Sequence, residues 1–158
     1  MVTKTVVDTN ILISLLNKDD PNNQRAVELL GKLNQEGGLF INTVVYSELA
    51  VYFDSRQELD SFLEDTGIRF EALKKEASQL AGEKFSEYLE NRGENLQCPR
   101  CGTENQLKCR KCETTLSWRQ HVNPDFLIGS HASQQADQLA SLDTGFHREY
   151  FPELEVVS

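Results

Sequence analysis

The sequence predicts an α/β fold in which helices flank a parallel sheet, with a small insertion in the second half of the chain. Short apolar runs alternate with amphipathic stretches of helical period, and this alternation is typical of a parallel sheet. It stops at residues 92–121, which are rich in Cys, Gly, Thr and Asn. We therefore expect residues 1–91 and 122–158 to form one domain and residues 92–121 to be an insertion in it.

The first part of the chain provides three strand-and-helix units. Each expected strand is a short continuous apolar run, and polar residues able to cap a helix follow the first two. Leu29, Leu30 and Leu33 recur at helical spacing, and Gly37 and Gly38 are expected to end that helix. The expected strands are 5–7, 39–41 and 68–70, and the expected helices are 11–16, 22–35, 42–53, 56–64 and 73–90.

Regular structure is expected again after the insertion. The expected elements are a helix over 124–136, a strand over 138–142, a short helical turn over 146–150 and a strand over 154–157. There is no internal repeat and no low-complexity segment.

Composition and charge exclude several classes of protein. The chain has 158 residues, with 16 Lys and Arg against 25 Asp and Glu, a net charge of −9. Such a chain cannot hold a phosphate backbone by overall charge, so any contact with nucleic acid must be local. No apolar run approaches the roughly 20 residues of a membrane span, and the first residues lack the layout of a secretion signal. We expect a cytoplasmic protein with no membrane contact.

Two aspartates are expected where strands end. Asp8 follows the first strand, and Asp143 follows the strand expected over 138–142. In open α/β sheets, ligands bind beyond the carboxyl ends of the strands, so both aspartates are candidates for a site. The alternative is that each one caps the helix that follows, because Asp is a favoured N-cap residue.

Glu48 and Asp125 are expected on the inner faces of helices. At 100° per residue, Glu48 lies at the edge of the face that carries Leu49 and Tyr52, and Asp125 lines up with Gly129. An unpaired buried carboxylate is costly, and few Lys or Arg positions turn inward, so a bound cation explains these acids. The alternatives are that Glu48 extends to solvent and that Asp125 only favours a helix N-terminus.

Oxygen ligands without His or Cys select Mg²⁺ or Mn²⁺, and the implied chemistry is phosphoryl transfer to water. The sequence has no Gly-x-x-x-x-Gly-Lys phosphate loop, no Gly-x-Gly-x-x-Gly and no Gly-x-Ser-x-Gly. The absence of these motifs argues against a nucleotide-binding protein and against an acyl-transfer enzyme.

Four acidic motifs carry a resemblance to a known family. They are Val6-Val7-Asp8-Thr9-Asn10-Ile11-Leu12, Tyr46-Ser47-Glu48-Leu49, Pro124-Asp125-Phe126-Leu127-Ile128 and Leu142-Asp143-Thr144-Gly145-Phe146. In order and spacing they resemble the motifs of PIN-domain ribonucleases, and most closely those of VapC-like toxins of type II toxin-antitoxin pairs. The resemblance covers the whole chain except the insertion.

The resemblance implies a parallel α/β/α fold, Mg²⁺- or Mn²⁺-dependent endonuclease activity on RNA, an antitoxin partner and frequently a homodimer. The implied metal-site acids are Asp8, Glu48, Asp125 and Asp143, and Asn10 helps to hold the first motif. Family members often carry a basic residue before the last Asp and a further acid after it, where this chain has Leu142 and His147. This departure leaves the number of metal ions open.

The insertion carries four cysteines in two Cys-x-x-Cys pairs, separated by seven residues. They are Cys98, Cys101, Cys109 and Cys112. This spacing predicts a compact zinc ribbon with a structural Zn²⁺, since four thiolates leave no open coordination position. The alternatives are redox-active or unliganded thiols, and His121 is a possible but unneeded ligand.

Charge indicates a use for this ribbon. Residues 92–121 contain six Lys and Arg against three Asp and Glu, a balance of +3, which leaves −12 for the rest of the chain. The expected RNA-binding residues are Arg100, Lys108, Arg110, Lys111 and Arg119, with Trp118 for base stacking. The alternatives are a protein contact, in a dimer or with an antitoxin, and a simple structural clip.

The predicted function is therefore that of a metal-dependent endoribonuclease of the toxin type. One alternative is a ribosomal-RNA processing PIN nuclease, but a zinc ribbon in that class usually follows the nuclease domain and does not interrupt it. The other alternative is a non-catalytic RNA-binding or scaffold protein with the same fold, against which the presence of all four acids argues.

Overall fold

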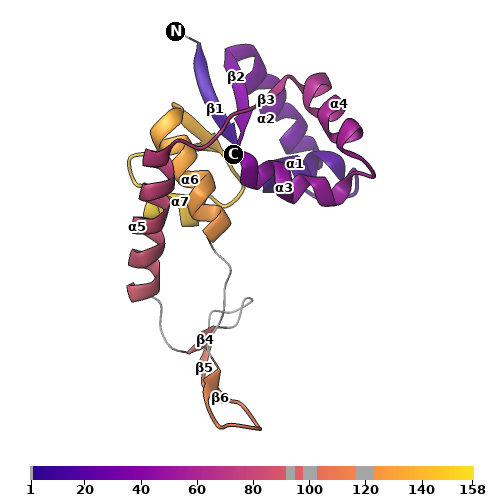
Figure 1. Ribbon diagram of the computed structural model, residues 1–158. Helices are drawn as coiled ribbons and strands as arrows, with labels where there is room; N and C mark the ends of the chain where they lie inside the picture. Colours follow the sequence, from indigo (N-terminus) through magenta and orange to yellow (C-terminus); the bar gives the residue numbers. More distant parts are fainter. Residues whose placement is uncertain (1, 92–94, 98–102, 117–122) are drawn as a thin grey trace.

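A parallel sheet of five strands forms the centre of the protein. The computed structural model describes residues 2–91, 95–97, 103–116 and 123–158 (Figure 1). The strands of the sheet are β1 (Thr3–Val7), β2 (Gly37–Ile41), β3 (Ile68–Phe70), β8 (Gln138–Ala140) and β9 (Glu155–Val157). Their order is β3-β2-β1-β8-β9, and all neighbours are parallel. The predicted α/β class with a parallel sheet is thereby confirmed.

Helices cover both faces of this sheet. They are α1 (Thr9–Leu16), α2 (Asn23–Glu36), α3 (Thr43–Leu49), α4 (Arg56–Thr66), α5 (Lys75–Asn91), α6 (Asn123–Gln135) and α7 (Thr144–Tyr150). Crossovers between parallel strands are right-handed, so the direction in which the chain moves across the sheet decides which face each helix covers. Figure 1 shows α5, α6 and α7 together on one side, with α1, α2 and α4 on the other.

The direction of strand addition reverses at β1. Strands β2 and β3 lie on one side of β1, whereas β8 and β9 lie on the other. Just beyond the strands, the N–H of Asp8 donates to the carbonyl oxygen of Ala140 at 2.9 Å and joins the ends of β1 and β8. Ligands of open α/β sheets bind at such a reversal point, beyond the carboxyl ends of the strands.

Side chains set the ends of two helices in the first half of the chain. At the start of α3, Oδ1 of Asn42 accepts a hydrogen bond from the N–H of Val44 at 2.9 Å. At the start of α4, Oγ of Ser55 accepts from the N–H of Glu58 at 3.2 Å. Helix α4 ends at Gly67, whose φ of 71° lies in the left-handed region that favours glycine.

Gly37 and Gly38 end α2, as the sequence predicts, but they also form the first residues of β2. The pairing of β2 with β1 explains why glycine stands here. A Cβ atom on Gly37 would lie 1.7 Å from the backbone oxygen of Thr3, so no other residue fits this close approach without moving the strands.

The prediction that Tyr52 lies on the inner face with Leu49 is wrong. The α-helix ends at Leu49 and continues as a 3₁₀ turn, η1 (Ala50–Tyr52). A 3₁₀ turn advances about 120° per residue instead of about 100°, so the helical projection fails beyond Leu49. Tyr52 is accordingly 55% exposed.

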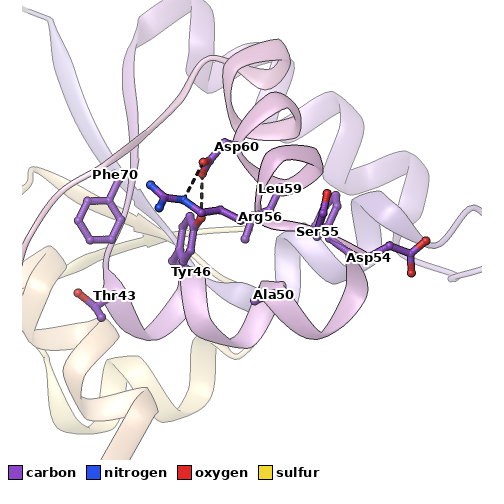
Figure 2. A pocket seen from close by; sticks show the side chains of 10 residues that line it. Thr43, Tyr46, Ala50, Asp54, Ser55, Arg56, Leu59, Asp60 and Phe70 are labelled. Carbon is purple, nitrogen blue, oxygen red and sulfur yellow. Dashed lines mark hydrogen bonds and ion pairs between the residues drawn. The ribbon is translucent and has the colours of Figure 1, made fainter.

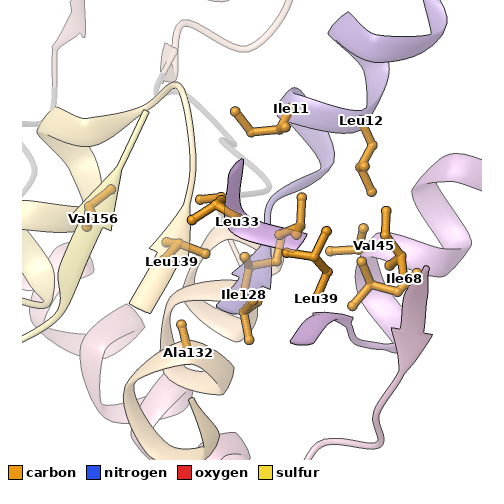
Figure 3. Packing of buried hydrophobic residues seen from close by; sticks show 14 of the residues in the cluster. Ile11, Leu12, Leu33, Leu39, Val45, Ile68, Ile128, Ala132, Leu139 and Val156 are labelled. Carbon is orange, nitrogen blue, oxygen red and sulfur yellow. The ribbon is translucent and has the colours of Figure 1, made fainter. Parts of the chain in front are cut away.

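The core lies between the sheet and both helix layers. Figure 3 shows branched aliphatic side chains from α1, β2, α3, β3, α6 and β8 packed against one another. A second group of rings surrounds the fully buried Phe126 of α6, with Tyr150 at 5.1 Å and Phe146 at 5.0 Å between ring centroids. Because Phe126 follows Asp125 directly, this packing anchors the start of α6.

The insertion forms two small antiparallel pairs. Strand β4 (Leu96–Gln97) pairs with β5 (Glu104–Asn105), and β6 (Leu107–Lys108) pairs with β7 (Thr115–Leu116). In Figure 1, β4, β5 and β6 lie beyond the ends of α5 and α6 that are farther from the sheet. The described residues include no helix with the length and apolar character needed to cross a bilayer.

Candidate active site

The carboxylate of Asp8 is held at the reversal point by three side chains. Its Oδ2 atom accepts from Oγ of Ser141 at 2.6 Å and from Nδ2 of Asn10 at 3.1 Å. It also contacts Nε2 of His147 at 3.3 Å. Asp8 is 5% exposed and makes no capping hydrogen bond to α1, so the alternative of a simple helix cap fails for this residue.

Glu48 reaches the same region from α3. Its side chain is half-buried, and the hydroxyl of Thr9 donates a hydrogen bond to Oε2 of Glu48. Thr9 follows Asp8 directly, so the start of α1 orients both carboxylates. The expectation that Glu48 sits at the edge of the inner face, not at its centre, agrees with this placement.

Asp125 approaches from the first turn of α6. Burial, together with the nearby Asp8, Glu48 and Asp143, raises the pKa of its carboxyl group to about 6, although His147 opposes the shift. A raised pKa at a half-buried carboxyl means that its negative charge is costly in this environment. The four acids of this region, Asp8, Glu48, Asp125 and Asp143, are named the acid site below.

Three of these acids line one pocket. It has a volume of about 420 Å³ and is lined by Asp8, Thr9, Asn10, Ile13, Glu48, Val51, Tyr52 and Asp125. Asp143 is exposed at the N-terminus of α7 and does not line the pocket. Its Oδ1 atom accepts from the N–H of Phe146 at 3.3 Å, so Asp143 does act as a helix cap.

Two residues of this region were not predicted as site residues. Ser141 donates to Asp8 and accepts the N–H of Asp143 at 3.1 Å, so it links two of the acids. His147 is 1% exposed and reaches Asp8 from the next helix. The only signal in the sequence is their position: Ser141 lies two residues before Asp143, and His147 lies one helical turn after it.

The donor atoms suit a divalent cation that prefers oxygen. Carboxylate oxygens select Mg²⁺ or Mn²⁺, and neither Lys nor Arg is paired with a member of the acid site among the described residues. In the part of the chain that the structure describes, no three potential ligands are gathered closely enough to hold one ion as they stand. Mutual repulsion of the carboxylates opposes such an arrangement until a cation compensates their charge.

A larger cavity lies on the other side of α3. It has a volume of about 780 Å³, and Figure 2 shows Tyr46, Phe70 and the pair of Arg56 and Asp60 around it. Nε of Arg56 and the hydroxyl of Tyr46 both bind the carboxylate of Asp60, at 3.2 and 2.8 Å. No member of the acid site lines this cavity. The volume of a cavity therefore does not by itself identify the candidate active site.

The predicted zinc ligands are described only in part. Cys109 and Cys112 flank a tight reversal in which the N–H of Glu113 donates to the oxygen of Cys109 at 2.8 Å. Hydrogen bonding to Thr114, and a contact with the side chain of Cys109, lower the pKa of the Cys112 thiol. Cys98 and Cys101 lie outside the described residues.

The predicted RNA-binding residues are also described only in part. Lys108, Arg110 and Lys111 are exposed on the second pair of strands and the turn that it encloses. Arg100, Trp118 and Arg119 lie outside the described residues, as does His121.

Residues 5–94 match the PIN domain family, which is more than half of the chain. The chain belongs to the PIN domain family. The matched region includes Asp8 and Glu48, whereas Asp125 and Asp143 lie beyond it. No curated protein matches the chain.

Solved structures similar to this PIN domain protein agree with the fold. VapBC2 from Rickettsia felis, bound to a DNA fragment from its promoter, has 21% identity and a TM-score of 0.56 over 98% of this chain and 97% of its own. VapBC-1 from nontypeable Haemophilus influenzae has 13% identity and a TM-score of 0.59 over 98% and 97%. VapC20 from Mycobacterium tuberculosis, a sarcin-ricin loop cleaving toxin, has 16% identity and a TM-score of 0.56 over 96% and 98%. At these identities, the likeness concerns the fold.

Proposed function

We propose that this PIN domain protein is a metal-dependent endoribonuclease that hydrolyses RNA phosphodiester bonds, and that it is the toxin of a toxin-antitoxin pair. The observation that carries the proposal is the convergence of Asp8, Glu48 and Asp125 on one pocket at the reversal point of the sheet. Asp8 directly follows β1, whereas Glu48 lies on α3 and Asp125 on α6, and these elements are distant in sequence. The similarity to VapC20, which cleaves RNA, supports the substrate class.

The acids of the site would hold Mg²⁺ or Mn²⁺. Such a cation, when bound, supplies Lewis-acid activation of the phosphate and of a water molecule. The chain supplies the positioning: Ser141, Asn10 and His147 hold Asp8, and Thr9 orients Glu48. A bound cation also offsets the cost of ionising Asp125, whose pKa is raised to about 6.

We infer a partner protein and a second copy of the chain as well. Two of the similar structures are VapBC assemblies, and one of them is bound to promoter DNA. This supports an antitoxin partner, and the homodimer stays a prediction from the family resemblance. Light scattering on the purified chain, alone and with its partner, measures both states.

The insertion is proposed to bind one structural Zn²⁺ through Cys98, Cys101, Cys109 and Cys112. The reversal at Cys109 and Cys112 supports this, because it includes Glu113 at a φ of 59° and brings the two thiols together. A lowered thiol pKa favours the thiolate that metals bind. Elemental analysis should find one zinc per chain in protein purified without chelator, and its absence would contradict the ribbon.

The ribbon is further proposed to contact RNA. The exposed Lys108, Arg110 and Lys111 are basic residues on an otherwise acidic chain. The insertion also leads directly into α6, whose first turn carries Asp125. RNA held by the insertion would therefore lie near the acid site.

An assay with end-labelled RNA in Mn²⁺ tests the nuclease. The wild-type chain should cleave internally, and Asp8→Asn should lose at least about a hundredfold in rate while keeping its circular dichroism spectrum, as expected when an essential ligand is removed. Asp19→Asn, an exposed control, should cleave at the wild-type rate. RNA binding without cleavage by the wild type would instead support the non-catalytic alternative.

A further inference from the structure

Hydrogen bonds already occupy one oxygen atom on three of the four carboxylates. The occupied atoms are Oδ2 of Asp8, Oε2 of Glu48 and Oδ1 of Asp143. Among the described residues, the second oxygen of each of these groups accepts no hydrogen bond from the protein. Each of the three carboxylates thus offers one oxygen to a cation.

The difference between an occupied and a free oxygen is clearest at Asp8. Its Oδ2 atom has three partners, Ser141 after β8, Asn10 on α1 and His147 on α7, at 2.6, 3.1 and 3.3 Å. A carboxylate oxygen with three protein partners has no lone pair left for a metal. Oδ1 is the atom through which Asp8 would act as a ligand.

The crowding of Oδ2 of Asp8 bears on how many ions the site takes, because Asp8 follows the central strand β1 at the reversal point. Two-metal nuclease sites place their ions about 3.5 to 4 Å apart, a spacing that a carboxylate spans when each of its oxygens binds one ion. Asp8 lacks that second oxygen, because Oδ2 already has three protein partners. Glu48 and Asp143 each keep one oxygen that is free of protein hydrogen bonds. Single oxygens from a few carboxylates, completed by water, are instead the usual ligand set of one Mg²⁺ or Mn²⁺.

We propose that the acid site binds one divalent cation through single carboxylate oxygens, and that His147 is a positioning residue that keeps Oδ2 of Asp8 turned away from it. This inference rests on the proposed function, because it assumes the metal site. It adds the stoichiometry and the ligand atoms, and it assigns a role to a residue that the sequence marked only as a departure from its family.

The surroundings of His147 fit this role. The imidazole is fully enclosed, with Phe146 and Phe151 at 5.1 and 6.3 Å between ring centroids. Its Nδ1 atom is buried and has no partner among the described residues, so we assign the ring hydrogen to Nε2, the nitrogen that faces Oδ2 of Asp8. His147 itself does not line the pocket of the acid site.

The first test is the stoichiometry of Mn²⁺ binding. The full chain is freed of metal, given one equivalent of Zn²⁺ to fill the thiolates, and titrated with Mn²⁺ by calorimetry and by electron paramagnetic resonance of the free ion. One Mn²⁺ per chain is expected. Two ions per chain would overturn this inference but leave the nuclease proposal intact, whereas no binding would contradict the nuclease proposal itself.

The second test concerns His147 and uses affinity for Mn²⁺, not activity. His147→Phe keeps the ring packing but removes the donor, and loss of such a supporting hydrogen bond typically weakens metal binding about 10- to 100-fold. His147→Gln, whose amide nitrogen can occupy the place of Nε2, should restore most of the lost affinity. Ser141→Ala removes the shortest bond to the same oxygen and should weaken binding without any change in the buried rings.

His131→Phe is the matched control. His131 is equally buried and also contacts a carboxylate, that of Glu71 at 2.9 Å, but it lies outside the acid site. Thermal unfolding of each variant separates lost stability from lost affinity. Wild-type affinity in both His147→Phe and Ser141→Ala, or an equal loss in His131→Phe, would overturn the positioning role.

Discussion

Asp8 is the most buried acid of the site, and it has no Lys or Arg partner among the described residues. Three polar neighbours stabilise its charge in place of a cation. Hydrogen bonds of this kind stabilise a buried carboxylate without neutralising it. Burial is the main reason why Asp125, across the pocket, resists ionisation, and the remaining negative potential of Asp8 adds to it.

The raised pKa of Asp125 predicts a pH dependence of stability. The folded-state pKa of about 6 exceeds the ordinary 3.8, so the folded state binds the proton more tightly than the unfolded state does. The resulting stabilisation is complete below about pH 4 and is lost as the pH rises through about 6. In the metal-free protein at pH 7.5, Asp125→Asn should therefore be more stable than the wild type, by about 1 to 2 kcal/mol after screening by solvent.

Urea unfolding at pH 4.5 and at pH 7.5 measures this difference. The advantage of Asp125→Asn should largely disappear at pH 4.5, where the wild-type carboxyl is protonated in the folded state. An equal advantage at both pH values would show that the effect is not one of ionisation.

The sequence identifies the acids of the site, but it does not identify the side chains that form hydrogen bonds with them. Helical projection places Glu48 and Asp125 toward the interior, and both are half-buried. It cannot reveal that Ser141 and His147 meet Asp8, because those contacts join residues 133 and 139 positions apart. It also fails for Tyr52, since the change from α-helix to 3₁₀ turn is not visible in the pattern.

Helix α6 packs closely against its surroundings. It carries Asp125 at its first turn, and its Gly129 faces the ring of Phe151. A Cβ atom at Gly129 would lie 2.4 Å from Cε2 of Phe151, which is itself 3% exposed. The position of the helix that presents Asp125 therefore depends on this glycine.

Gly129→Ala should destabilise the protein by about 1 to 3 kcal/mol, as is typical when a methyl group is forced into a filled core. Gly82→Ala on α5 is the matched control, because a Cβ there meets nothing within 4 Å. It should stabilise the helix by about 0.5 to 1 kcal/mol. Denaturant unfolding measures both changes, and a neutral Gly129→Ala would show that Phe151 moves aside at little cost.

The insertion is proposed to contact RNA. The contribution of its basic turn to RNA binding can be tested separately from catalysis. Arg110→Ala with Lys111→Ala should weaken RNA binding and lower the slope of log K against log salt by roughly 0.7 per lost single-strand contact. Cleavage of saturating RNA should change little. Arg25→Ala with Lys32→Ala removes the same charge from α2 and serves as the control.

Fluorescence anisotropy across a range of salt concentrations gives the slope for both double variants. Unaltered RNA affinity in the Arg110 and Lys111 variant, together with loss of dimerisation or of partner binding, would instead assign the insertion to protein contact. Equal slopes in the two double variants would show that the basic residues of the insertion affect RNA binding only through the net charge of the chain.

For the whole molecule, the class of fold follows from the sequence because strands and helices alternate. The helices from α1 to α5 all occur near their expected positions. The order of the strands does not follow. It depends on the crossover from β3 to β8, which passes back over β1 and carries the insertion with it. That crossover brings Asp125 and Asp143 to the side of Asp8, so topology, not local pattern, assembles the acid site.

If the assembled acid site needs a divalent cation to cleave RNA, removal of metal should abolish cleavage. This is measured by following RNA cleavage by the wild-type chain after removal of metal, with Mg²⁺ or Mn²⁺ then added back while Zn²⁺ is kept at one equivalent. We expect no cleavage without the added ion, restored cleavage with it, and none at any ion concentration for Asp8→Asn. Equal cleavage by the metal-free wild type, or full metal-dependent activity in Asp8→Asn, would contradict this expectation.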